Sequence, residues 1–187
     1  MVQPHFEKSV NSLKSKLARM STKPPRLAIF VDGANIDTPA REANLRINYA
    51  RFRAYLVGSR NLVSATFYES RTANLGKRAF YSDVKKAGFV LKLGPYVLYE
   101  EKQKEIDVQI AVDAVSGAYE NQFDIAVLGS GDGDMAPIVR KLKSMGKEVE
   151  VASFNDRGQG KKSQLAWSLK TEATRIRDLT YDIRKIT

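Results

Sequence analysis

The chain has 187 residues, enough for one domain with a sizeable core, and its 43% hydrophobic content predicts a folded protein. It has no cysteine and one histidine, His5, which excludes a disulfide framework, a thiol nucleophile and Cys-ligated zinc and argues against histidine-based catalysis. No apolar run approaches the roughly 18 residues of a membrane span and no signal-peptide pattern occurs, so we expect a cytoplasmic protein without membrane contact.

The formal net charge of +10 is concentrated at the two ends of the chain. Residues 1–26 hold six Lys/Arg and one acid, a net of +5, and residues 157–187 hold eight and three, again +5. Residues 27–156 hold 17 of each sign and balance to zero. This distribution favours a polyanionic partner, RNA or DNA. The alternative is that the basic ends are solvated and only aid solubility.

The first segment, residues 4–20, predicts a basic amphipathic helix. Lysines alternate with apolar side chains at helical spacing, namely Phe6, Val10, Leu13, Leu17 and Met20. Residues 21–25 break the pattern. Such a helix could pack on the domain, form a homodimer with a second copy or lie on a membrane surface, and packing on the domain is the simplest of the three.

Beyond residue 25, short apolar runs alternate with helical patterns. We expect strands at about 26–32, 62–68, 89–93, 124–129 and 149–154. We expect helices at about 49–57, 73–87, 106–119, 135–145 and 161–170. A loop should follow the first strand through Pro39, residues 94–105 should form a charged connection, and a short strand or helix should end the chain. This alternation predicts a parallel α/β sheet with helices on both faces.

Acidic residues follow two of the predicted strands. Asp32 ends the first strand, and Asp132 and Asp134 lie in the glycine-rich loop after the strand at 124–129. The carboxyl ends of parallel strands share one edge of the sheet, where ligands bind at the point of reversed strand order. If the two strands are neighbours, the three acids converge and suggest a bound cation.

A fourth acid, Asp107, opens the predicted helix 106–119. At about 100° per residue it lies on the apolar face with Ala111, Ala114 and Ala118, whereas Asp113 lies on the polar, solvated face. A lone carboxylate on an apolar face is costly unless it is paired or bound to metal.

Each acid also has a purely structural explanation. Asp107 could complement the helix dipole, and Asp134 could be the N-cap of helix 135–145. Asp132 could be a turn former, and Asp32 with Asn35 could make an Asx-type turn. If all of these acids lie at one edge of one sheet, a separate structural explanation for each is less economical than one shared site.

Three stretches together resemble the signatures of the NYN domain family, the PIN-like nuclease group that includes LabA-like bacterial proteins. They are residues 31–36, residues 104–108 with Asp113 further on, and residues 129–135. The resemblance implies a three-layer α/β/α sandwich with a central, mainly parallel sheet. It covers about residues 26–180, with residues 1–25 as helix and linker and residues 181–187 as a basic tail.

The resemblance also implies a function and a site. The family's acidic site binds Mg²⁺ or Mn²⁺ and is associated with RNA cleavage. The corresponding catalytic residues here are Asp32, Asn35, Asp107, Asp132 and Asp134. The four acids are the expected metal ligands, with Asp134 holding a second ion or orienting water. The sequence departs from the family pattern at Glu105, Gly133 and Met135, and none of these changes removes a carboxylate.

We therefore expect a Mg²⁺- or Mn²⁺-dependent (endo)ribonuclease. Four basic residues near the predicted edge should hold the RNA backbone: Arg71, Lys77, Arg78 and Lys104. The main alternative is an NYN-fold RNA-binding or regulatory module with weak or no catalysis. A phosphotransferase with an Asp-x-Asp pair would need an acid where Ala34 stands. A nucleotide-binding protein is a further alternative, but the loop 129–134 has neither a P-loop Lys-Ser/Thr nor the last glycine of a dinucleotide fingerprint.

Overall fold

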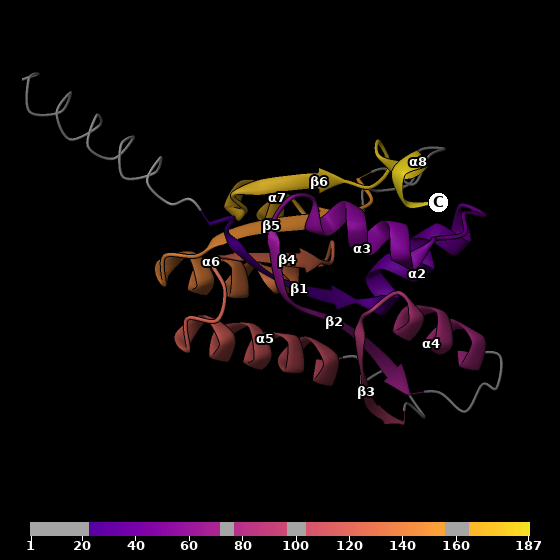
Figure 1. Cartoon of the computed structure of the whole chain (residues 1–187), viewed down its shortest axis with the longest axis horizontal. Helices are drawn as coiled ribbons and strands as arrows, with labels where there is room; N and C mark the ends of the chain where they lie inside the picture. Colours follow the sequence, from indigo (N-terminus) through magenta and orange to yellow (C-terminus); the bar gives the residue numbers. More distant parts are fainter. Residues whose placement is uncertain (1–22, 72–76, 97–103, 156–164) are drawn as a thin grey trace, which may run out of the picture.

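The structure is a computed structural model that describes residues 23–71, 77–96, 104–155 and 165–187 (Figure 1). The predicted N-terminal helix lies outside these residues, as do the start of the predicted helix at 73–87 and most of the first turn of the one at 161–170. Among the described residues, no helix combines the length and apolar character needed to cross a membrane.

Six parallel strands form one sheet in the order β3-β2-β1-β4-β5-β6. They are β1 (Arg26–Asp32), β2 (Asn61–Arg71), β3 (Val90–Tyr96), β4 (Ile125–Gly129), β5 (Glu148–Ser153) and β6 (Arg175–Asp178). From β1 the chain adds β2 and then β3 on one side. Strand β4 then pairs with the other side of β1, and β5 and β6 extend the sheet in that direction. The strand order therefore reverses between β1 and β4, where Val31 lies opposite Gly129.

Helices cover both faces of the sheet. They are α2 (Gly33–Glu42), α3 (Tyr49–Val57), α4 (Lys77–Lys86), α5 (Lys104–Tyr119), α6 (Ala136–Ser144), α7 (Trp167–Glu172) and α8 (Ile183–Ile186), with a 3₁₀ turn, η2 (Gly133–Met135), before α6. Figure 1 shows α3 and α8 on one side of the sheet and α5 and α6 on the other. The predicted three-layer α/β/α sandwich is confirmed.

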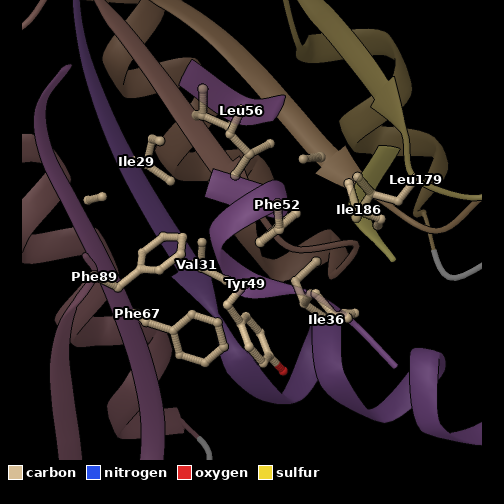
Figure 2. Packing of buried hydrophobic residues seen from close by; sticks show 14 of the residues in the cluster. Ile29, Val31, Ile36, Tyr49, Phe52, Leu56, Phe67, Phe89, Leu179 and Ile186 are labelled. Atoms are coloured by element: carbon tan, nitrogen blue, oxygen red, sulfur yellow. The ribbon is translucent and has the colours of Figure 1, made fainter. Parts of the chain in front are cut away.

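Alternate residues of the central strands feed two separate cores. Ile29 and Val31 point into a cluster with Phe52 and Leu56 of α3 (Figure 2). Ala28 and Phe30 pack in the second cluster, against α5, α6 and α7. Because both faces are buried, β1 and β4 are continuous apolar runs, as expected for central parallel strands.

The helix predicted at 49–57 is confirmed at both ends. The Asn48 side chain accepts the N–H of Arg51 at 3.1 Å, which satisfies a donor in the first turn. Gly58 follows with φ of 56°, a left-handed conformation that glycine adopts without strain.

The predicted loop from residue 33 through Pro39 is wrong, because α2 spans Gly33–Glu42. Pro39 cannot donate a backbone hydrogen bond within the helix. Ile36 and Ala40, however, are almost completely buried against the sheet, and Asp32 caps the first turn. Tertiary packing therefore outweighs the local cost of the proline.

Several predicted boundaries also shift. Strands β2 and β3 run on to Arg71 and Tyr96, which pair with each other, so residues 94–96 belong to a strand and not to the predicted connection. Helix α7 begins only at Trp167. The helix predicted at 135–145 begins with the 3₁₀ turn η2, and Pro137 lies in the first turn of α6.

Candidate acidic site at the edge of the sheet

Asp32 ends β1 at the point where the strand order reverses. Its side chain is almost fully buried and accepts two hydrogen bonds from Asn35, one from the side-chain amide at 2.7 Å and one from the backbone N–H at 3.3 Å. Burial raises the pKa of Asp32; the hydrogen bonds oppose this rise, and the charge of Asp132 adds to it. The Asx-type turn predicted for Asp32 and Asn35 is therefore present, but it leaves a buried carboxylate at the sheet edge.

Gly33 lets the start of α2 approach the end of β2. A Cβ atom at this position would lie 2.4 Å from the Phe67 ring and 2.8 Å from a carboxylate oxygen of Glu69. Neither separation is sterically allowed, so this place in the motif requires glycine.

Asp132 and Asp134 lie in the loop after β4. Asp132 accepts the N–H of Asp134 at 3.0 Å and caps η2, while its own N–H donates to the Ser130 hydroxyl at 3.2 Å. The cap is therefore Asp132 and not, as one alternative had it, Asp134. The Asp134 side chain is exposed at the mouth of the loop.

Asp107 lies in the first turn of α5 and is half-buried. Burial, followed by the negative charges of Asp32, Asp132 and Asp134, raises its pKa to about 6. Four acids from three separate parts of the chain are therefore close enough to influence one another electrostatically.

A small cavity of about 80 Å³ joins these groups at the sheet edge. It is lined by Asp32, Ala34, Asn35, Glu69, Ser70, Ile106, Asp107 and Asp132. Of the five predicted catalytic residues, four line this cavity and Asp134 lies outside the lining.

Glu69 is the acid that the sequence analysis missed. It is 5% exposed, and burial raises its pKa; the ammonium group of Lys77, 3.2 Å away, opposes this rise and Asp32 adds to it. Its position at the carboxyl end of β2 was a usable signal, because that end lies at the same edge as Asp32.

The four predicted RNA-binding residues differ in their surroundings. Lys77 is partly exposed and already paired with Glu69, whereas Arg78 is exposed at the start of α4. Arg71 ends β2 and Lys104 begins α5, but their side chains lie outside the described part of the structure.

Asp113 lies on the polar face of α5, as predicted, but it is only partly exposed and its carboxylate is bound by other side chains. It accepts hydrogen bonds from the Tyr68 hydroxyl and the Lys92 ammonium group, both at 2.6 Å, and from Gln109 at 3.0 Å. Burial alone would raise the pKa of Asp113, but these hydrogen bonds outweigh it and hold the pKa below its usual value. Asp113 therefore ties α5 to β2 and β3 and takes no place in the cavity.

A second missed residue is Trp167, the only tryptophan of the chain, with 78% of its surface exposed. The preceding Ala166 donates its N–H to Gly131 at 2.9 Å. A Cβ at Gly133 would lie 3.3 Å from Ala166 and 3.4 Å from Ser168, so the residues on both sides of Trp167 pack against the acidic loop. A large exposed aromatic side chain thus belongs to the segment that packs against the acidic loop.

The cavity is lined by oxygen atoms that suit a divalent metal ion, but its side chains do not form a complete set of direct ligands. All of its donors are carboxylate, amide or hydroxyl oxygens, which Mg²⁺ prefers and which Mn²⁺ accepts. In the described residues, however, no three His, Cys, Asp or Glu side chains stand close enough together to hold an ion. Because Mg²⁺ retains several waters, the donor chemistry fits an ion held partly through water.

The fold and this edge define an α/β sandwich with an acidic site at the switch point of the sheet. The NYN domain profile matches residues 26–180, and the chain therefore belongs to the NYN domain family, as the three motifs predicted. NYN domains are generally PIN-like nucleases, and such nucleases generally use divalent metal ions.

Two known proteins are similar to this chain. The "Low amplitude and bright protein LabA" of Synechococcus elongatus is 24% identical over 175 residues, 88% of this chain and 89% of that protein. A crystal structure of a Vibrio parahaemolyticus protein of unknown function superposes with a TM-score of 0.72 at 24% identity, over 86% of this chain and 96% of the other. At this identity the second comparison supports the fold alone.

Proposed function

We propose that this protein is a Mg²⁺- or Mn²⁺-dependent ribonuclease that cleaves RNA phosphodiester bonds at the acidic cavity. The observation that carries the proposal is the meeting of Asp32, Asp107 and Asp132 at one small cavity. The three residues come from the end of β1, the start of α5 and the loop after β4. Carboxylates that repel one another are retained at a cost in stability, which a bound cation removes.

Asp32, Asp107 and Asp132 would hold the ion, directly or through water. When bound, a divalent ion would supply an activated water and neutralise the negative charge on the non-bridging oxygens and the leaving oxygen of the phosphate. Asn35 fixes the orientation of the Asp32 carboxylate through its two hydrogen bonds. Asp134 is exposed two residues after Asp132, and it would orient water or hold a second ion.

Basic and aromatic side chains around the cavity would hold the RNA strand. Arg78 and Lys77 begin α4, and Arg71 and Lys104 occupy the neighbouring ends of β2 and α5. Contacts to phosphates add affinity without sequence specificity. Trp167, which is exposed in the segment that packs against the acidic loop, can stack on an unpaired base, which favours single-stranded substrate.

A catalytically weak RNA-binding module is the second candidate. Two observations favour it, namely the lack of a ready metal-ligand group in the described residues and the departures at Glu105, Gly133 and Met135. Both candidates predict RNA binding, and only the first predicts metal-dependent cleavage.

Cleavage of end-labelled single-stranded RNA and matched DNA separates the two. Each substrate is incubated with Mn²⁺, Mg²⁺ or EDTA and with wild type, Asp32→Asn, Asp132→Asn or Glu148→Gln. Glu148 is exposed at the amino end of β5, on the opposite edge, and serves as the matched control. We expect metal-dependent RNA cleavage that both Asp variants lose and the control keeps. RNA binding without cleavage in any metal would favour the regulatory module, and cleavage of DNA alone would overturn the substrate class.

A further inference from the structure

Helix α5 carries an unpartnered apolar stripe on its outer face. Val108, Val112 and Tyr119 are 61%, 53% and 84% exposed, and Val115 between them is partly exposed. Their steps of four, three and four residues keep all four side chains within about 60° of helix surface. The buried face of α5, which carries Ile110 and Ala114, points the other way, into the core.

The composition of this stripe is unusual for a surface in contact with water. Valine is a poor helix former, and an exposed helix position gives no packing that would compensate. Val108 and Val112 also line a cavity of about 630 Å³ between α5 and the edge strand β3. A row of such residues beside a groove is typical of a surface that another element covers.

The sequence contains a matching row in the N-terminal segment, which lies outside the described residues. Its apolar residues Phe6, Val10, Leu13 and Leu17 repeat the same steps of four, three and four, and Met20 continues the pattern. Two such rows are what a pair of packed helices brings together at its seam.

We propose that residues 4–20 form a helix that packs on the α5 stripe of the same chain, parallel to α5. The register brings Leu13 against Val115, with Val10 one step earlier against Val112.

The connection to β1 favours this orientation. The Arg26 guanidinium donates to the Asn121 carbonyl at 2.6 Å, so the chain enters β1 two residues beyond the end of α5. From residue 20 to residue 26 the chain spans about 20 Å at most. That length suffices to step between helices about 8–10 Å apart. An antiparallel helix would instead place its last residue near the amino end of α5, about 20 Å further from the start of β1 along the helix axis.

Charge favours the same pairing. Residues 105–120 contain four acids and no Lys or Arg, whereas residues 4–20 contain four Lys/Arg and one acid, a net of +3. Of the four acids, Asp107 lines the acidic cavity and Asp113 is bound to Lys92, so the exposed Glu105 and Glu120 are the ones left to attract the basic segment. Complementary charges select this partner face over others. The short connection also keeps the segment at high effective concentration near its own α5, which favours the same chain over a second copy.

Disulfide trapping tests the proposal cleanly because the natural chain has no cysteine. Leu13→Cys with Val115→Cys is oxidised in the full chain and compared with Ser12→Cys with Val115→Cys, in which the first thiol is turned about 100° away from the seam. We expect the in-register pair to form an intramolecular disulfide in most molecules, seen as faster migration without reducing agent, and the control to form it at least about fivefold less.

Three results would overturn the proposal. Disulfide-linked dimers in place of monomers would make a second copy the occupant. Equal trapping by both pairs, or by neither, would mean that the segment does not pack in this register.

Hydrogen exchange on the full chain gives a check without engineered thiols. Val112→Lys should remove the protection of amides in residues 8–18, whereas Val63→Lys, at a 45% exposed valine of β2, should leave it unchanged. Unprotected amides in the wild type would contradict the proposal as well.

Discussion

Asp107 is a single residue that lowers the stability of the folded chain at neutral pH, and in our proposal it does so to bind metal. The folded protein raises its pKa to about 6, first through burial and then through the charges of Asp32, Asp132 and Asp134. A carboxyl whose pKa is higher in the folded than in the unfolded chain favours folding when it is protonated. Its contribution is complete below the unfolded pKa of about 3.9 and is lost as the pH rises through 6.

Asp107→Asn should therefore stabilise the metal-free protein at pH 7.5 while it removes cleavage. Allowing for solvent screening of a half-exposed group, we expect a gain of about 1 kcal/mol, or about 2–4 °C in melting temperature. Circular-dichroism melts in EDTA measure this, and the gain should shrink towards pH 4. Asp113→Asn is the control and should destabilise, because it weakens the links to Tyr68 and Lys92. A lower melting temperature for Asp107→Asn at pH 7.5 would contradict the account.

The pair of Lys77 and Glu69 gives a second prediction for individual residues. Lys77→Ala would leave the buried Glu69 carboxylate without its cation, at a cost of about 1–3 kcal/mol in the free energy of unfolding. Adding Glu69→Gln should recover most of that stability, because no buried charge then lacks a partner.

Urea unfolding of the two single variants and the double variant measures the coupling. RNA binding should stay weakened in the double variant, because the proposed contact of Lys77 with phosphate is still missing. Recovery of binding together with stability would show that Lys77 acts only on the fold.

Regular elements were largely predictable from local pattern. Asn48 and Gly58 bracket α3 where the capping signals placed them, and the apolar runs gave all five expected strands. The helix α2 was missed because Pro39 is a strong local signal, whereas the burial of Ile36 and Ala40 that overrides it depends on distant strands.

The acids at the edge of the sheet were only partly predictable, because some are marked by local motifs and others meet only through the tertiary fold. The glycine-rich motifs and the helical periodicity around Asp107 are local, so these acids could be identified from the sequence. Glu69 lies in a strand with no special motif, and only the sheet order brings it to Asp32. Trp167 and the polar contacts of Asp113 likewise depend on tertiary packing that no local pattern encodes.

Helix α7 supplies a prediction at the level of one element. Because Trp167 is the only tryptophan, its fluorescence should change when single-stranded RNA binds in EDTA. Trp167→Ala should weaken that binding about 5- to 150-fold, the range for loss of one base stack. Tyr181→Ala, at an 87% exposed aromatic of the turn before α8, should have little effect. Equal losses in both variants, or no change in emission, would exclude base stacking on Trp167.

The whole molecule combines an electrically neutral middle with basic ends and one acidic edge. The neutral part, residues 27–156, contains all of the acids that line the cavity. The switch between β1 and β4 brings acids together from parts of the chain about a hundred residues apart. If the protein is a metal-dependent nuclease, these carboxylates share a divalent cation.

Titration of the full chain with Mn²⁺, followed by the electron paramagnetic resonance of the free ion, tests that claim most directly. We predict saturable binding at pH 7.5 that Asp32→Asn and Asp132→Asn each weaken at least about tenfold and that Glu148→Gln leaves unchanged. Binding should also weaken at pH 5, because Asp107 with a pKa of about 6 is then largely protonated and protons compete with the metal. No saturable binding, or equal affinity in all four proteins, would contradict the account.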